Sequence, residues 1–279
     1  MLTYSSRSRA RKNKRGAREL ALALALLWLS AAAAAQIYLP PPPPADPADY
    51  GRVVLDHHAA TSPGGVVFDH WLHRAKFTCR LCHVDIGFAM EANGTGISAD
   101  ANRQGFYCGA CHNGTRSFEG QKIFAACTSA PATPECNRCH SLGKPEAMRT
   151  YQYKKFTAKL PHGRYGIKWM AAEESGRIHP VDILEGISVK KAKMQSRPDF
   201  SIEAKLDWVH PITFSHEKHS VWNGCELCHP EIFPAKREGT RVTMFSNLEH
   251  RHCGACHGKV AFPLNQCSSC HEFAPPWAQ

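Results

Sequence analysis

The sequence has no stretch in which basic and aromatic residues gather, although its formal net charge is +10. Seven of its 34 basic residues lie before Leu20, in a segment with one acidic residue, Glu19. The rest of the chain has 27 basic and 23 acidic side chains. A nucleic-acid-binding protein needs a basic patch on its folded part. The sequence therefore argues against nucleic acid as a partner.

The apolar run over residues 20–35 is also short, because a membrane-spanning helix needs about 20 apolar residues. The run follows a basic segment and ends in five alanines, an order typical of a cleaved signal peptide. We therefore expect residues 1–35 to direct export to the periplasm. An uncleaved membrane anchor and release outside the cell are the alternatives. The prolines of residues 36–52 predict an extended tether.

The cysteines show a fixed pattern: twelve of the thirteen occur in six C-x-x-C-H pentapeptides. This pentapeptide is the attachment signature of c-type haem, in which both cysteines bind the macrocycle and the histidine ligates the iron. A zinc ribbon or a disulfide framework needs no histidine at that place. The predicted attachment residues are Cys79, Cys82, Cys108, Cys111, Cys136, Cys139, Cys225, Cys228, Cys253, Cys256, Cys267 and Cys270. The predicted proximal ligands of haems one to six are His83, His112, His140, His229, His257 and His271.

The motifs belong to an internal duplication. The segment FDHWLHRAKFTCRLCH, residues 68–83, recurs as FSHEKHSVWNGCELCH, residues 214–229, and six positions keep an offset of 146. The next motif is CGACH in both copies, and the first copy has about 14 extra residues before its third motif. Cys127 lies in this insertion; we expect it to be buried and inert, with pairing to a partner as the alternative. The duplication predicts triheme domains over 53–142 and 210–273, a connector over 143–209 and a tail over 274–279.

Each copy is too short to surround its haems with regular secondary structure. Residues 210–271 provide roughly 21 residues for each motif. We therefore predict a mainly irregular fold with short α-helices and little strand, in which the haems form most of the core. Short helices are expected over residues 68–73, 166–172 and 199–208.

Two histidines precede the first motif of each copy. His70 and His73 are three residues apart and would share one face of a helical turn. His216 and His219 repeat the pair, six residues before a motif cysteine. We predict that these four are distal iron ligands. We expect the remaining histidines outside the motifs and their immediate flanks to be solvated or structural: His57, His58, His162, His179 and His210.

The order F-x-H-x-x-H, C-x-x-C-H, C-G-A-C-H and C-x-x-C-H resembles the triheme cytochrome c7 class, a relative of cytochrome c3, over residues 68–140 and 214–271. The resemblance implies a periplasmic electron carrier. It also implies four ligand pairs: His70 with His83, His73 with His112, His216 with His229, and His219 with His257.

The same resemblance implies that the distal ligand of each third haem precedes the second motif. The second copy offers Met244, His250 and His252 there. The first copy has no histidine between His83 and Cys108, so Met90 is its only soft donor. An open iron at haem three is the alternative to Met90.

The leading functional hypothesis is electron transfer without catalysis, by six covalently attached haem c groups. Iron with two histidine ligands has no free coordination site, and closely packed haems pass electrons between macrocycles. The expected partners are redox proteins such as other cytochromes, quinol-oxidising membrane complexes or terminal reductases. One alternative is a multihaem reductase with an open site at haem three or six. Another is a subunit of an extracellular cytochrome filament or conduit.

Overall fold

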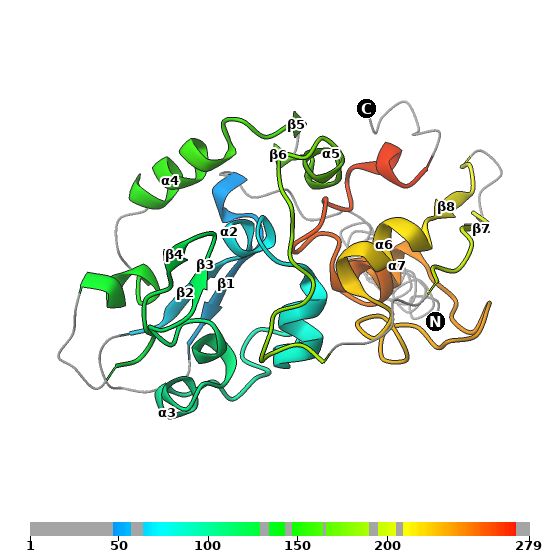
Figure 1. Ribbon diagram of the computed structural model, residues 1–279. Helices are drawn as coiled ribbons and strands as arrows, with labels where there is room; N and C mark the ends of the chain where they lie inside the picture. The colour runs from blue at the N-terminus through cyan, green and yellow to red at the C-terminus, as the bar shows by residue number, and fades with distance from the viewer. Residues whose placement is uncertain are drawn as a thin grey trace, which may run out of the picture.

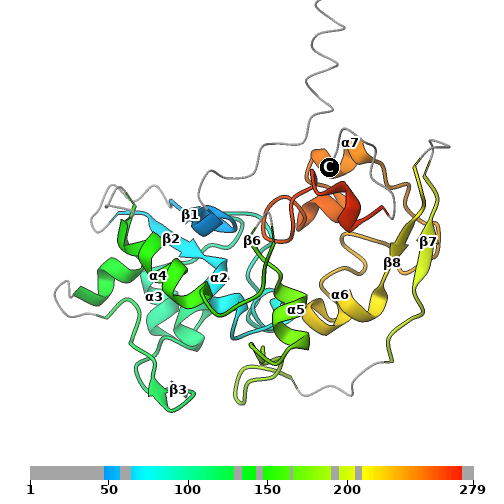
Figure 2. The same cartoon turned by 90° about the horizontal axis from the view of Figure 1, so that it is seen from above.

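The structure is a computed structural model that describes residues 47–56, 64–128, 134–142, 147–163, 166–189, 195–204 and 209–271. The predicted signal peptide, the tether up to residue 46, His57, His58 and the tail lie outside these ranges. Figure 1 shows the two copies as neighbouring lobes, with helix α5 and the segment after it running between them. Figure 2 shows the same order from above.

The first copy is built around a short hairpin. Strands β1 (Arg52–Leu55) and β2 (Val66–Asp69) pair antiparallel, and helix α2 (His70–Arg74) follows directly. The predicted helical turn therefore begins at His70, because Phe68 and Asp69 belong to β2. The other elements of this copy are η2 (Leu81–Ile86, one π-helical turn), α3 (Ala99–Arg103), η3 (Tyr107–Ala110), β3 (Ser117–Phe118), β4 (Gln121–Lys122) and η4 (Pro134–Arg138).

The second copy has the same plan. Strands β7 (Phe200–Ile202) and β8 (Ile212–Phe214) pair antiparallel and lead into α6 (His216–Asn223). The helix expected over residues 199–208 is wrong, because Phe200 pairs with Phe214 across this ladder. The remaining elements are α7 (Met244–Leu248), η5 (His252–Ala255) and η6 (Cys267–Ser269).

Side chains capping the helices fix where two of these short elements begin. The Ser215 hydroxyl accepts a hydrogen bond from the Lys218 amide at 3.3 Å at the start of α6. Thr243 and Ser246 form a reciprocal capping box at the start of α7. Such caps stabilise helices that are too short to form alone.

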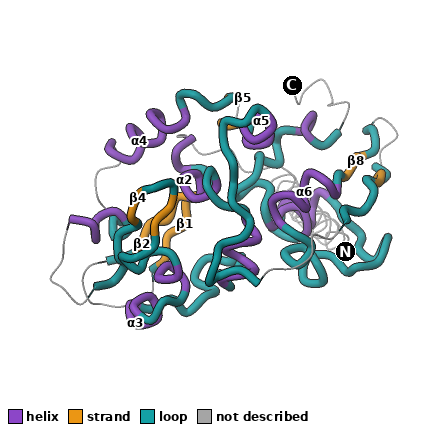
Figure 3. Tube along the Cα trace, viewed as in Figure 1, coloured by secondary structure: helices purple, strands orange, loops and turns teal. Residues whose placement is uncertain are grey.

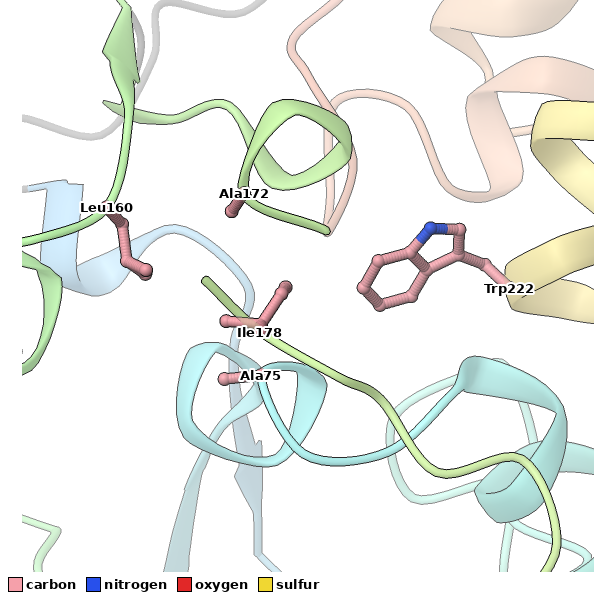
Figure 4. Packing of buried hydrophobic residues seen from close by; sticks show 5 residues of the cluster. All are labelled: Ala75, Leu160, Ala172, Ile178 and Trp222. Carbon is pink, nitrogen blue, oxygen red and sulfur yellow. The ribbon is translucent and has the colours of Figure 1, made fainter. Parts of the chain in front are cut away.

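The connector contains α4 (Ala147–Thr157), β5 (His162–Gly163), β6 (Gly166–Ile167) and α5 (Trp169–Glu174). The helix expected over residues 166–172 begins only at Trp169, because Gly166 and Ile167 pair with β5. The cluster in Figure 4 joins three parts of the chain: Ala75 of the first copy, Leu160, Ala172 and Ile178 of the connector, and Trp222 of the second copy.

The N-terminal edge of the first copy differs from the domain boundary that we predicted. The turn η1 (Pro47–Asp49) places Ala48 against Trp71 and Tyr153, with 2% of its surface exposed. Residues 47–52 are therefore packed on the first copy, and do not continue the tether.

Leu81 is the one large side chain that is fully buried within the described ranges. Figure 3 shows that loops and short elements make up most of the described chain. The predicted fold class, mainly irregular with short helices, is confirmed. A chain with so few buried side chains needs another source of core.

Candidate functional site

A continuous cavity of about 2440 Å³ runs through both copies. A pocket for one small ligand has a volume of roughly 300–1,000 Å³, so this cavity is large enough for several macrocycles. Its walls carry motif residues from both copies together with histidines from outside the motifs. The histidines that line it are His70, His73, His83, His112, His219, His252, His257 and His271.

Three predicted ligand pairs face each other across this cavity. The ring centres of His70 and His83 are 6.4 Å apart, and their planes differ by 7°. The ring centres of His73 and His112 are 6.3 Å apart, at 55°. In the second copy, those of His219 and His257 are 6.3 Å apart, at 61°.

This spacing suits one iron between two imidazoles. Two metal–nitrogen bonds of about 2 Å in line, plus roughly 1 Å from each nitrogen to its ring centre, separate the ring centres by about 6 Å. Rings in van der Waals contact would be closer, and unrelated rings would show no repeated value. The three pairs therefore fit haems one, two and five.

The fourth predicted pair is not brought together in the same way. No ring contact of this kind joins His216 and His229 in the described part of the second copy. Each ring nevertheless has an Nδ1 hydrogen-bonding partner on the main chain: Pro198 O for His216 and Phe233 O for His229.

Hydrogen bonds orient the imidazoles of both copies. A carbonyl oxygen only accepts, so an Nδ1 paired with it must carry the proton, and Nε2 keeps the free lone pair that binds a metal. Eight predicted ligands have this pairing at 2.6–3.3 Å: His70, His83, His140, His216, His219, His229, His257 and His271. The acceptors were not foreseen from the sequence, because a main-chain carbonyl leaves no signal in residue type.

Burial keeps several of these histidines neutral. Desolvation lowers the pKa of His73 and His257 to about 4. It also lowers the pKa of His70, His83 and His219. A neutral imidazole is the form that binds iron. The Nδ1 atoms of the paired His73 and His112 are buried without a hydrogen bond of normal geometry.

The motif thiols lie in surroundings that disfavour thiolate. Burial raises the pKa of Cys82 and Cys256 to about 12, and that of Cys108 and Cys270 to about 11. Zinc binds the thiolate form. All thirteen cysteines lie in the described ranges, and none forms a disulfide. No three metal-binding side chains converge within those ranges.

The predicted sites of haems three and six each have a predicted proximal histidine, but no single distal residue stands out. The Nδ1 of His140 pairs with Gly64 O at 2.7 Å, and that of His271 with His210 O at 3.0 Å. Met90 lines the cavity with 36% of its surface exposed, and Met244 with 46%, so neither is a core residue.

The two histidines before Cys253 lie differently with respect to the cavity. His252 lines it, and its Nδ1 lies 3.0 Å from the Ser246 hydroxyl, whereas His250 is not among the lining residues. The geometry therefore favours His252 over His250 as a ligand from this segment.

A close backbone contact explains the glycine of both CGACH motifs. A Cβ on Gly109 would lie 1.8 Å from the Asn102 carbonyl oxygen, and one on Gly254 would lie 1.8 Å from the Asn247 carbonyl oxygen. The contact brings the end of α3 or α7 against the haem-binding turn. Only glycine fits there, and the equal distances show that the two copies share this geometry.

Cys127 lies between the second and third motifs of the first copy. The Asn102 side-chain amide donates a hydrogen bond to the Cys127 sulfur at 3.5 Å. Burial is the main cause of the raised pKa of Cys108 and Cys139, and the neighbouring Cys127 adds to it in both. Its side chain is half-buried. The insertion thus places the extra thiol beside the haem-binding cysteines and not on a remote loop.

No helix in the described ranges has the length and apolar character that crossing a membrane requires.

Comparison with solved structures gives three matches, all from GSU1996. The C-terminal hexahaem fragment is 19% identical, with 84% of this chain and 100% of that chain covered and a TM-score of 0.25. The N-terminal hexahaem fragment is 22% identical, with 80% and 99% covered and a TM-score of 0.24. The dodecahaem protein is 19% identical, with 80% of this chain and 48% of that chain covered and a TM-score of 0.26. No protein with a curated description matches the chain.

The family model described as cytochrome c7 and related cytochrome c matches residues 66–141 and again residues 212–272. These regions coincide with the two copies found in the sequence, and together they contain all six motifs. Both copies therefore belong to the family of cytochrome c7 and related cytochromes c, and the chain is a multihaem c-type cytochrome with two tandem domains of this class.

Proposed function

We propose that this multihaem cytochrome is an exported carrier of six haems that passes electrons between respiratory redox partners. The observation that supports it best is the set of histidine pairs with ring centres 6.3–6.4 Å apart in one continuous cavity. Iron held by two histidines has no position for a substrate, and its remaining chemistry is the gain and loss of an electron.

The chain's residues have separate roles in this function. The motif cysteines would hold each macrocycle, and the paired histidines would fix the iron between them. The carbonyls that accept from Nδ1 orient the rings and make them more basic, which tunes the potential of the iron. Haem c, when bound, supplies the electron-accepting iron.

The proposed ligands of haems one, two, four and five are the four histidine pairs. Haem three would take Met90 or stay open, and haem six would take Met244 or His252. Partners would be other cytochromes, quinol-oxidising membrane complexes or terminal reductases. The basic and apolar segment over residues 1–35 supports export to the periplasm.

A reductive titration of the purified exported protein tests the proposal. We expect six electron equivalents to be taken up per chain, with low-spin spectra for at least the four bis-histidine haems and no binding of carbon monoxide or nitrite at those haems. Uptake of far fewer equivalents contradicts the carrier proposal. Turnover of nitrite or a similar oxyanion at a high-spin iron would support the reductase alternative.

A further inference from the structure

The two domains meet directly at the loop that follows the fifth motif. The Tyr50 hydroxyl donates to the Ala261 carbonyl, and the Arg74 guanidinium donates to Val260 O at 2.6 Å. A Cβ on Gly51 would lie 3.7 Å from Val260. The first domain therefore holds the loop next to haem five through three residues.

The first and fourth motifs also meet. A Cβ on Gly224, which precedes Cys225, would lie 2.6 Å from the Arg80 side chain inside the first motif. Burial is the main cause of the raised pKa of Cys228 and Cys256, and Coulomb repulsion from Cys79 adds to it in both. The attachment sites of haems one, four and five are therefore neighbours across the junction.

Arg74 is a half-buried cation at this junction. Its guanidinium lies 4.9 Å from the Trp169 ring centre and 5.3 Å from that of Trp222. Its Nε is inaccessible to solvent and has no hydrogen-bonding partner within the described ranges. Arginine stays protonated in proteins, and a buried charge requires a partner of opposite sign.

The groups that face Arg74 belong to two haem sites. Its charge affects the pKa of Tyr50, Cys79, His70, Cys256 and His257. These include an attachment cysteine and an iron ligand of haem one, and an attachment cysteine and an iron ligand of haem five. No carboxylate of the described residues forms an ion pair with Arg74.

Arg74 also breaks the symmetry of the duplication. At the offset of 146 that relates the two copies, its counterpart is Ser220. Arg74 faces the other domain, whereas Ser220 hydrogen-bonds within its own helix, to Glu217 O at 3.2 Å. At this position of the repeat, only the first copy has a cation.

We propose that Arg74 binds a propionate carboxylate of haem one or haem five and thereby sets the reduction potential of that haem, at the point where the two domains meet. This inference rests on the proposed function. Each haem carries two propionates, which supply the missing anion in a cavity that Arg74 lines. The fixed positive charge stabilises the reduced iron and raises the potential of that haem. Electrons moving between the two triads would pass this point.

The test replaces Arg74 in the holoprotein. Arg74→Met removes the charge and keeps the length of the side chain, while Arg74→Lys keeps the charge without Nε. The matched control is Arg177→Met, which removes an exposed charge from the connector. Spectroelectrochemistry should show a lower midpoint potential for one haem in Arg74→Met, a smaller change in Arg74→Lys and none in Arg177→Met.

The pH dependence separates this role from a structural one. In the wild type the paired propionate stays ionised through neutral pH. In Arg74→Met its pKa rises, so the potential of that haem should fall with increasing pH where the propionate titrates. Haem methyl resonances in paramagnetic NMR assign the effect to the haem attached at Cys79 or at Cys256.

Unchanged potentials and unchanged pH dependence in a fully loaded Arg74→Met protein would overturn the inference. If this variant does not mature, a crystal structure of the wild-type holoprotein decides: a propionate oxygen within hydrogen-bonding distance of Nε supports the proposal, and its absence overturns it. A wild-type protein without haem would instead overturn the proposed function.

Discussion

Replacing the glycine of a CGACH motif by alanine should destabilise the protein, and the effect can be derived from one contact. A methyl group on Gly254 would lie 1.8 Å from the Asn247 carbonyl oxygen and 2.7 Å from its carbon. Side-chain Cβ atoms essentially never approach within 3.0 Å. The turn η5 and the end of α7 must therefore separate by roughly 1 Å or more.

The oxygen belongs to the main chain, so it cannot move aside as a side chain would. Overpacking of this kind costs about 1–3 kcal/mol. Because 1 kcal/mol lowers Tm by roughly 2–4 °C in a chain of about this length that unfolds as one unit, Gly254→Ala should melt about 2–12 °C below the wild type. Neither Gly254 nor Gly109 has a positive φ, so the cost is steric and not conformational.

Thermal unfolding followed by far-UV circular dichroism measures the effect. Gly109→Ala should give the same loss, since its Cβ meets the Asn102 oxygen at the same 1.8 Å. Gly96→Ala is the control, because nothing lies within 4 Å of a Cβ built there. Melting temperatures of both motif variants within error of the control would refute the close approach that the structure shows.

Three other predictions concern the haems. His73→Ala should convert one haem to a high-spin form in the visible and EPR spectra. His179→Ala, which replaces an exposed histidine, is the control and should leave the spectra as in the wild type. A His73→Ala protein with no new high-spin haem would contradict the predicted pair of His73 with His112. Cys127→Ser should keep the full haem content, because Cys127 belongs to no C-x-x-C-H motif; loss of a haem would assign the thiol to attachment or ligation. Chain produced without haem attachment should show the far-UV spectrum of an unfolded protein, as metal-dependent domains do, and native secondary structure without haem would contradict a haem-based core.

The sequence predicted what depends on short spacings. The motif cysteines follow from local patterns. The resemblance to the cytochrome c7 class implied the pairs of His70 with His83, His73 with His112 and His219 with His257, and the structure brings these histidines together. Local spacing was sufficient for the cysteines because a C-x-x-C-H segment forms one turn whatever surrounds it.

Features that depend on distant contacts were not predicted. Residues 200–202 form a strand because Phe200 pairs with Phe214 and their rings lie 5.4 Å apart. Ala48 is buried because Trp71 and Tyr153 meet over it. The contact of Arg74 with the loop at Val260 leaves no local signal in the sequence, since the two residues are 186 positions apart.

The intact mass of the exported protein is the sharpest test of covalent attachment of six haems, because haems bound in this way remain attached under denaturing conditions. We expect one species, cleaved after the alanines that end at residue 35, whose mass exceeds that of the polypeptide by six haem groups. A mature chain with fewer haems, or with none, would contradict it.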